Sequence, residues 1–182
     1  MQFSLSRLFG LVTFSALTIA ILMYVTTNYR ERLRVRAQLM SMGAYFVGFG
    51  ADNLVDSVSF HDPIKSTEIA RFQSIEVLDF KEAHVTPESI ENIYGLKNVQ
   101  MIVFELSDVR DEDIAKLKNI NSLRTLWLSH TGVSDSCVDA IADIPGLEKV
   151  YLFSTQITQK GIDRLKDAKP LLNVKSIPKK RD

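Results

Sequence analysis

The sequence has few of the residues that build disulfides and metal sites. Its 182 residues include one cysteine, Cys137, which excludes an internal disulfide and leaves the redox compartment open. The three histidines, His61, His84 and His130, fall at different positions of the repeat described below, which argues against a shared metal site. We therefore predict no metal and no cofactor.

Catalytic signatures are missing as well. No Ser-His-Asp or Cys-His arrangement can be assembled from matching repeat positions. The stretch 48–53 begins like a dinucleotide-binding loop but lacks the third glycine and a following helix. Cys137 precedes a predicted helix, where a lowered thiol pKa is conceivable, but Gly161 at the equivalent position favours simple packing. We predict that the protein is not an enzyme.

The charge is balanced overall but unevenly distributed. The chain has 22 Lys and Arg against 22 Asp and Glu. Residues 1–42 contain five Arg and one Glu, which leaves 17 basic against 21 acidic residues in the remainder. Nucleic-acid binding calls for a clustered basic face, so this acidic remainder argues against it.

A long uncharged run lies near the amino terminus. Residues 8–27 contain no charged side chain, and a helix of this length spans roughly 30 Å, the thickness of a bilayer's hydrocarbon core. The alternative is a cleaved signal peptide, whose apolar run is usually only ~7–15 residues and ends in a small-x-small site. We predict that residues 1–29 form a single-pass transmembrane anchor in the cell membrane.

The arginines flanking this run predict its orientation. Arg30, Arg32, Arg34 and Arg36 follow it, whereas Arg7 alone precedes it and counts for the opposite orientation. The positive-inside bias therefore places the rest of the chain in the cytoplasm. We expect residues 30–62 to form a juxtamembrane helix, ended by Gly43, and a cap. This cap consists of two short strands at 44–50 and 54–60, joined by a turn at 51–53. A short helix over 63–71 follows, with Asp62 as its N-cap.

The remainder repeats with a period of 24 residues. The pattern L-x-x-L-x-L-x-x-T-x-V occupies residues 123–133, and related lines occupy 75–85, 99–109 and 147–157. Such self-similarity indicates a solenoid, in which each unit buries the apolar face of its neighbour. Each unit is predicted to contain a strand, a turn and a return helix. The inward strand positions are Leu78 and Phe80, Ile102 and Phe104, Leu126 and Leu128, and Val150 and Leu152.

The repeat boundaries carry their own signals. Thr86, Ser134 and Thr158 are suited to capping the return helices, whereas Arg110 is not, and we expect Asp111 to replace it. Leu171 and Val174 fit a fifth, partial strand. The predicted solenoid therefore covers residues 63–175, with 176–182 as a tail.

Residues 60 to about 175 resemble the leucine-rich-repeat family. The turns Val133–Val138 and Ile157–Ile162 are similar to its ribonuclease-inhibitor-like and cysteine-containing subtypes, and the layout resembles bacterial membrane-anchored proteins with an N-terminal span. The resemblance implies an α/β solenoid with a parallel sheet on its concave face and helices on its convex face. The family's inward Asn or Cys is replaced here by Ala83, Ser107, Thr131 and Thr155; hydroxyls can satisfy turn backbone groups, but Ala83 cannot.

The outward strand residues form the candidate binding site. Parallel strands lie about 4.8 Å apart, so the side chains in question should be neighbours on the concave face. They are Met101, Val103, Trp127, Tyr151 and Phe153. We hypothesise that this patch docks a protein or peptide. Alternatively, the aromatic rings only pack across strands, or the chain's own tail covers them.

The resemblance implies binding rather than catalysis. We therefore expect a membrane-anchored, non-catalytic protein–protein interaction module. One alternative is a structural envelope protein that self-associates into a homo-oligomer. Another is an adaptor or receptor subunit of a signalling or protein-degradation complex.

Overall fold

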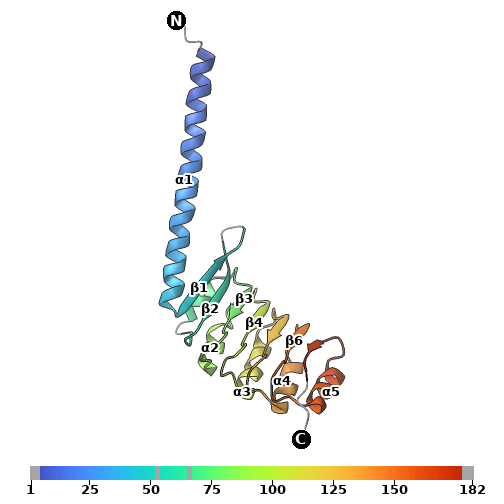
Figure 1. Ribbon diagram of the computed structural model, residues 1–182. Coiled ribbons are helices and arrows are strands. Elements are labelled where there is room, and N and C mark those ends of the chain that lie inside the picture. Colours follow the sequence, from blue (N-terminus) through green and yellow to red (C-terminus); the bar gives the residue numbers. More distant parts are fainter. Residues whose placement is uncertain (1–4, 52–53, 65–66, 178–182) are drawn as a thin grey trace. The chain divides into compact units, whose positions relative to one another are not determined.

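The computed structural model describes residues 5–51, 54–64 and 67–177, with the side chains of residues 5–16 excluded. The chain divides into two compact units, Met1–Gln38 and Leu39–Asp182 (Figure 1). The first consists of most of helix α1 (Leu5–Ser41), and the second contains the sheet and the remaining helices. The domain boundaries expected from sequence, at 29, 62 and 175, remain predictions.

Helix α1 is continuous over 37 residues. It ends next to Gly43, whose φ of +105° is easily adopted only by glycine, as expected for the predicted helix stop. Its large apolar side chains from Leu17 (60%) to Val25 (55%) are exposed, whereas Leu39 near its end is buried.

Within the described part of the chain, no helix combines the length and the apolarity needed to cross a membrane. The predicted anchor at residues 8–27 begins among side chains that lie outside the described part.

One seven-stranded sheet runs through the second unit in the order of the sequence. β1 and β2 pair antiparallel, which confirms the predicted hairpin, and every later pair is parallel. Residues 52–53 of the predicted turn lie outside the described part. The strands are β1 (Ala44–Phe49), β2 (Val55–Phe60), β3 (Val77–Asp79), β4 (Met101–Val103), β5 (Thr125–Trp127), β6 (Lys149–Tyr151) and β7 (Asn173–Lys175).

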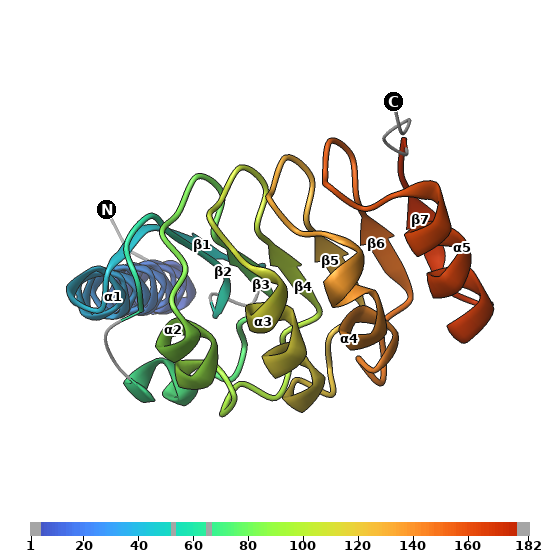
Figure 2. The same cartoon turned by 90° about the horizontal axis from the view of Figure 1, so that it is seen from below.

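The register confirms the 24-residue repeat. Leu78 pairs with Ile102, Ile102 with Leu126, and Leu126 with Val150, so equivalent residues form adjacent rungs of one ladder. Helices α2, α3, α4 and α5 lie along the same side of the sheet (Figure 2). The helical segments are η1 (Thr67–Arg71), α2 (Pro87–Asn92), α3 (Asp111–Ile114), η2 (Ala115–Asn119), η3 (Asp135–Cys137), α4 (Val138–Ala142) and α5 (Gln159–Ala168).

The core lies between the sheet and these helices. All the predicted inward strand residues are at most 1% exposed. Phe60, Phe80 and Phe104 stack in sequence, with ring centroids 5.6 and 5.3 Å apart. Aromatic stacking of this kind adds about 0.5–1.5 kcal/mol per pair beyond the burial of area. The cap is thus joined to the repeats by a continuous column of rings.

Three expectations at the ends of the solenoid are wrong. The helix predicted over 63–71 is instead the 3₁₀ turn η1, which begins at Thr67; residues 65–66 lie outside the described part. The fifth, partial strand is confirmed as β7, which contains Val174, but Leu171 lies before this strand and is 95% exposed, and Leu172 is buried in its place. The 24-residue period aligns Ala168 with the buried Leu96, Ile120 and Ile144 and so predicts it in the core, but it is exposed. A terminal unit has a neighbour on one side only, so positions that are buried in the middle of the solenoid open to solvent at its end.

Hydrogen bonds link the start of each return helix to the next unit. Thr86, Ser134 and Thr158 cap their helices as predicted. The expected cap at Asp111 is wrong, because the Asp113 carboxylate accepts the Arg110 N–H at 3.0 Å. Asp111 instead accepts the Ser134 N–H and hydroxyl, at 2.7 and 2.6 Å.

Asp135 repeats this arrangement one unit later, where it accepts the Thr158 N–H and hydroxyl, both at 2.7 Å. The two carboxylates therefore fasten neighbouring units edge to edge.

A second series of hydrogen bonds lies on the inward side of the turns, where the Thr131 and Thr155 hydroxyls donate to the carbonyls of Leu128 and Leu152, at 2.7 and 3.1 Å. This is the role expected for these hydroxyls.

Candidate binding surface on the open face of the sheet

The candidate residues lie on the sheet face opposite the helices, which we call the open face. Val103 of β4 pairs in register with Trp127 of β5, and Trp127 with Tyr151 of β6. Met101 precedes Val103 by two residues, and Phe153 follows Tyr151 by two, so both share the face with them. The structure therefore brings the five residues of the predicted patch together from three adjacent strands, β4, β5 and β6, and the segment after β6. Whether it binds anything stays a prediction.

The aromatic rings pack against one another. Trp127 and Tyr151 stack with centroids 4.0 Å apart and an interplanar angle of 9°, and the Phe153 ring lies 6.4 Å from that of Tyr151 at 45°. All five candidate residues are partly exposed. Packing between the strands covers one side of each ring and leaves the rest open. The rings therefore pack across the strands and also remain accessible, so these two interpretations of the sequence do not exclude each other.

The indole of Trp127 has an unusual feature. Its Nε1–H is covered, yet it has no hydrogen-bond acceptor in the described part of the chain. Leaving such a donor without a partner costs about 1–3 kcal/mol. Trp127 is also the only tryptophan of the chain, so its fluorescence and its indole N–H resonance report on this surface alone.

Charges divide the open face into two halves. In the first, Lys81 and Glu105 form an ion pair at 3.2 Å, and the hydrogen bond that Lys81 donates to the Glu105 carboxylate raises the pKa of Lys81. In the second, Lys149 and Lys175 make no ion pair within the described residues. A hollow of about 360 Å³ adjoins this half and is lined by Phe153 and Ile177 together with the loop 154–156.

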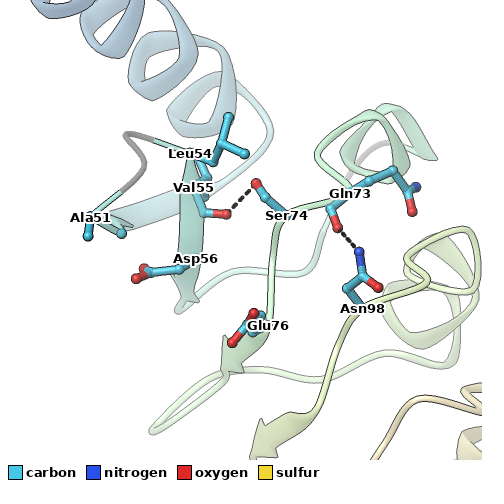
Figure 3. Close-up of a pocket in the computed structure, with 9 residues that line it drawn as sticks. Ala51, Leu54, Val55, Asp56, Gln73, Ser74, Glu76 and Asn98 are labelled. Atoms are coloured by element: carbon cyan, nitrogen blue, oxygen red, sulfur yellow. Dashed lines mark hydrogen bonds between the residues drawn. The ribbon is translucent and has the colours of Figure 1, made fainter.

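A larger cavity of about 690 Å³ lies where β2, β3 and β4 begin (Figure 3). The Ser74 hydroxyl donates to the Val55 carbonyl at 2.5 Å, and the Asn98 amide donates to the Gln73 carbonyl at 2.6 Å. Asp56 and Glu76 add two carboxylates to the lining. Sequence reasoning missed this cavity because one of its walls, residues 50–51 and 54–56, comes from the cap, which lies outside the repeat pattern.

The remaining polar candidates are dispersed. His61 stacks on Tyr45 with ring centroids 3.8 Å apart, whereas His84 contacts Asp108. His130 is exposed in the turn after β5. Among the described residues, no group of three or more His, Cys, Asp or Glu side chains could hold a metal ion.

Two buried groups have pKa values raised by their surroundings. Cys137 is fully buried, and burial raises the pKa of its thiol, with Asp111 adding to the effect. A reactive thiolate is thereby disfavoured, and the packing interpretation is supported. Asp113 is 2% exposed, burial raises the pKa of its carboxyl, and its Oδ1 lacks a partner in the described part.

Comparison with protein-family models and with curated proteins gives no match. Among solved structures, internalin C2 from Listeria monocytogenes is 24% identical, with a TM-score of 0.41 over 61% of this chain and 55% of its own. Internalin F from the same organism is 12% identical, with a TM-score of 0.43 over 68% and 41%. The actin-binding site 2 of leiomodin-1 is 10% identical, with a TM-score of 0.49 over 61% and 76%.

This chain therefore spans about half the length of the internalin structures that it matches. Similarities this low define neither function nor family, so the repeat architecture rests on the strand register of this chain. That register by itself characterises the second unit as a short α/β solenoid of 24-residue repeats.

Proposed function

We propose that this protein is a non-catalytic, membrane-anchored interaction module that binds a partner protein on the open face of its sheet. The observation that carries the proposal is the stacked pair Trp127 and Tyr151, which remains partly exposed on the face free of helices. Partly exposed aromatic rings with a surrounding apolar surface are typical of binding hot spots. Met101, Val103 and Phe153 extend the surface around them.

The membrane anchor forms part of the same proposal. Support comes from the uncharged run at residues 8–27 and from the exposed apolar side chains of α1. Leu17, Ile19, Leu22 and Met23 are each at least 57% exposed, and they lie on different sides of the helix. Covering apolar surface contributes about 25 cal/mol per Å², so a lipid environment stabilises such a helix. We further propose that the solenoid faces the cytoplasm.

The binding proposal is tested on the full chain in the cells that produce it. Tagged parent protein and the double variant Trp127→Ala/Tyr151→Ala are captured after crosslinking, and the bound proteins are quantified. We expect partners of the parent to be lost from the double variant and retained by Tyr94→Ala, an aromatic truncation after α2. Partners unchanged by the double variant contradict the proposal.

Topology is tested separately. An enzymatic reporter active only in the cytoplasm, fused after Asp182, is expected to be active. A second fusion, to a reporter active only outside the cytoplasm, is expected to be silent. The reverse result overturns the orientation, and recovery of the intact chain in the soluble fraction overturns the anchor.

A second candidate function is self-association. The terminal strand β7 lies at the end of the sheet, and its flanking residues Leu171 and Ile177 are 95% and 74% exposed. An exposed edge strand with apolar neighbours is a template for pairing with another chain. Analytical ultracentrifugation in detergent separates the candidates, because a defined homo-oligomer lost in Leu171→Lys/Ile177→Lys favours self-association. No observation here favours the adaptor or receptor role.

A further inference from the structure

The second half of the open face carries two lysines that flank the aromatic rings. Lys149 lies two residues before Tyr151 on β6, so both side chains project from the same face. Lys175 of β7 pairs in register with Tyr151. Tyr151 therefore has a cationic neighbour along its own strand and another on the adjacent strand.

Neither cation is neutralised by a described residue. The ion pairs of the described part include Lys81 with Glu105 on this face but neither Lys149 nor Lys175. Their register partners in the sheet are uncharged. Lys149 pairs with Thr125 of β5 and with Asn173 of β7, and Lys175 pairs with Tyr151. The half of the face that carries the aromatic rings is thus positively charged and has no counter-ion among the described residues.

The separation of the two lysines suits an extended peptide. Adjacent strands lie about 4.8 Å apart and residues i and i+2 of a strand roughly 6.6 Å apart, so the two Cα atoms lie on a diagonal of roughly 8 Å. Carboxylates at alternate positions of an extended chain have a comparable spacing. An apolar side chain at the next alternate position, which faces the sheet as the carboxylates do, meets the rings of Tyr151 and Phe153 or enters the hollow beside Ile177.

We propose that the partner presents an acidic extended segment, with carboxylates at alternate positions and an aromatic or aliphatic side chain nearby. Lys149 and Lys175 bind the carboxylates, while Trp127, Tyr151 and Phe153 hold the apolar side chain. This inference rests on the proposed function and adds the chemistry of the partner.

The test is a selection from a phage-displayed library of random dodecapeptides on the full chain in detergent. Parallel selections use Lys149→Glu/Lys175→Glu and the matched control Lys118→Glu/Lys166→Glu, whose lysines are exposed on helical segments. We expect peptides enriched in Asp and Glu at alternate positions beside an apolar residue. Their binding, followed by Trp127 fluorescence, should weaken by about tenfold or more in the first variant and stay unchanged in the control.

Neutral or basic consensus sequences, no enrichment, or equal binding to the first variant all overturn the inference. Sedimentation with phosphatidylserine vesicles that depends on these lysines, without peptide enrichment, assigns them to lipid and also overturns it. Cellular partners that are lost on truncating Trp127 and Tyr151 but retained on reversing the lysines refute the acidic partner and leave the proposed function standing. Partners that survive both changes refute both proposals.

Discussion

Gly161 lies directly against Asp135: a Cβ atom built on Gly161 would stand 2.2 Å from the Asp135 Oδ1. The same oxygen accepts the Thr158 N–H at 2.7 Å, and the other carboxylate oxygen, Oδ2, accepts the Thr158 hydroxyl. A glycine in the last unit thus leaves room for the carboxylate that fastens this unit to the one before it. The position is filled by Cys137 one unit earlier, where the carboxylate is Asp111.

We predict that Gly161→Ala destabilises the protein by about 1–3 kcal/mol, because the methyl group displaces Asp135 from Thr158. Chemical denaturation of the parent and variant measures the difference. Gly132→Ala is the matched control, since a Cβ there meets nothing within 4 Å, and its stability should be unchanged or slightly raised. In an Asp135→Ala background the Gly161→Ala cost should shrink, and an undiminished cost contradicts the mechanism.

Four non-glycine residues occupy the left-handed region at equivalent places in the turns, namely Glu82, Leu106, His130 and Ser154, with φ between 55° and 60°. This conformation costs a non-glycine residue about 1–3 kcal/mol, and a β-branched one more. Leu106 is also 49% exposed, so little packing is lost on its removal.

We therefore expect Leu106→Gly to leave stability unchanged or to raise it by up to about 1 kcal/mol, because relief of strain exceeds the chain-entropy cost of glycine. Leu106→Ile, of equal volume, should be destabilising by about 1 kcal/mol or more. Thermal unfolding of the two variants provides the comparison. Both changes acting in the same direction would falsify the strain argument.

The Asp108 carboxylate should make the solenoid sensitive to acid. Burial by itself raises the pKa of Asp108, but hydrogen bonds from the Val85 N–H, at 2.7 Å, and from His84 outweigh it and lower the pKa below 3.8. A carboxyl with a pKa lowered by folding contributes stability above its unfolded-state pKa, and this contribution is lost as the pH falls through the folded-state pKa.

Asp108→Asn should consequently lower the free energy of unfolding at pH 7 and have a smaller effect at pH 2–3. Urea titrations at a series of pH values measure this difference. A comparable exposed carboxylate, Glu148→Gln, controls for the change in net charge. A pH-independent effect of Asp108→Asn excludes the proposed linkage.

The hydroxyl series offers a paired test of turn stabilisation. Thr131→Val removes the buried bond to the Leu128 carbonyl and should cost about 1 kcal/mol. Ala83 occupies the equivalent place in the first unit, is 3% exposed and has no hydroxyl, so Ala83→Ser should stabilise by up to about 1 kcal/mol. Differential scanning calorimetry distinguishes the two changes. A destabilised Ala83→Ser shows that the first turn has no room for the hydroxyl.

The sequence alone determined the repeat and its register, because stacked units require the same apolar residue at the same place. Leu78, Ile102, Leu126 and Val150 could therefore be aligned before any coordinate was known. The two-residue alternation of strands likewise placed Trp127 and Tyr151 on the outward face.

Tertiary structure decided whatever depends on a neighbour outside the repeat pattern. Asp111 caps no helix because Ser134 of the next unit takes its carboxylate. Leu171 matches the core pattern yet is exposed, since β7 is the last strand of the sheet. The cavity beside Asp56 and Glu76 joins the cap, which lies outside the repeat pattern, to the loops before β3 and β4. Periodicity encodes contacts between equivalent residues, whereas ends, cross-unit hydrogen bonds and cavities arise from contacts between unlike ones, which only the folded chain brings together.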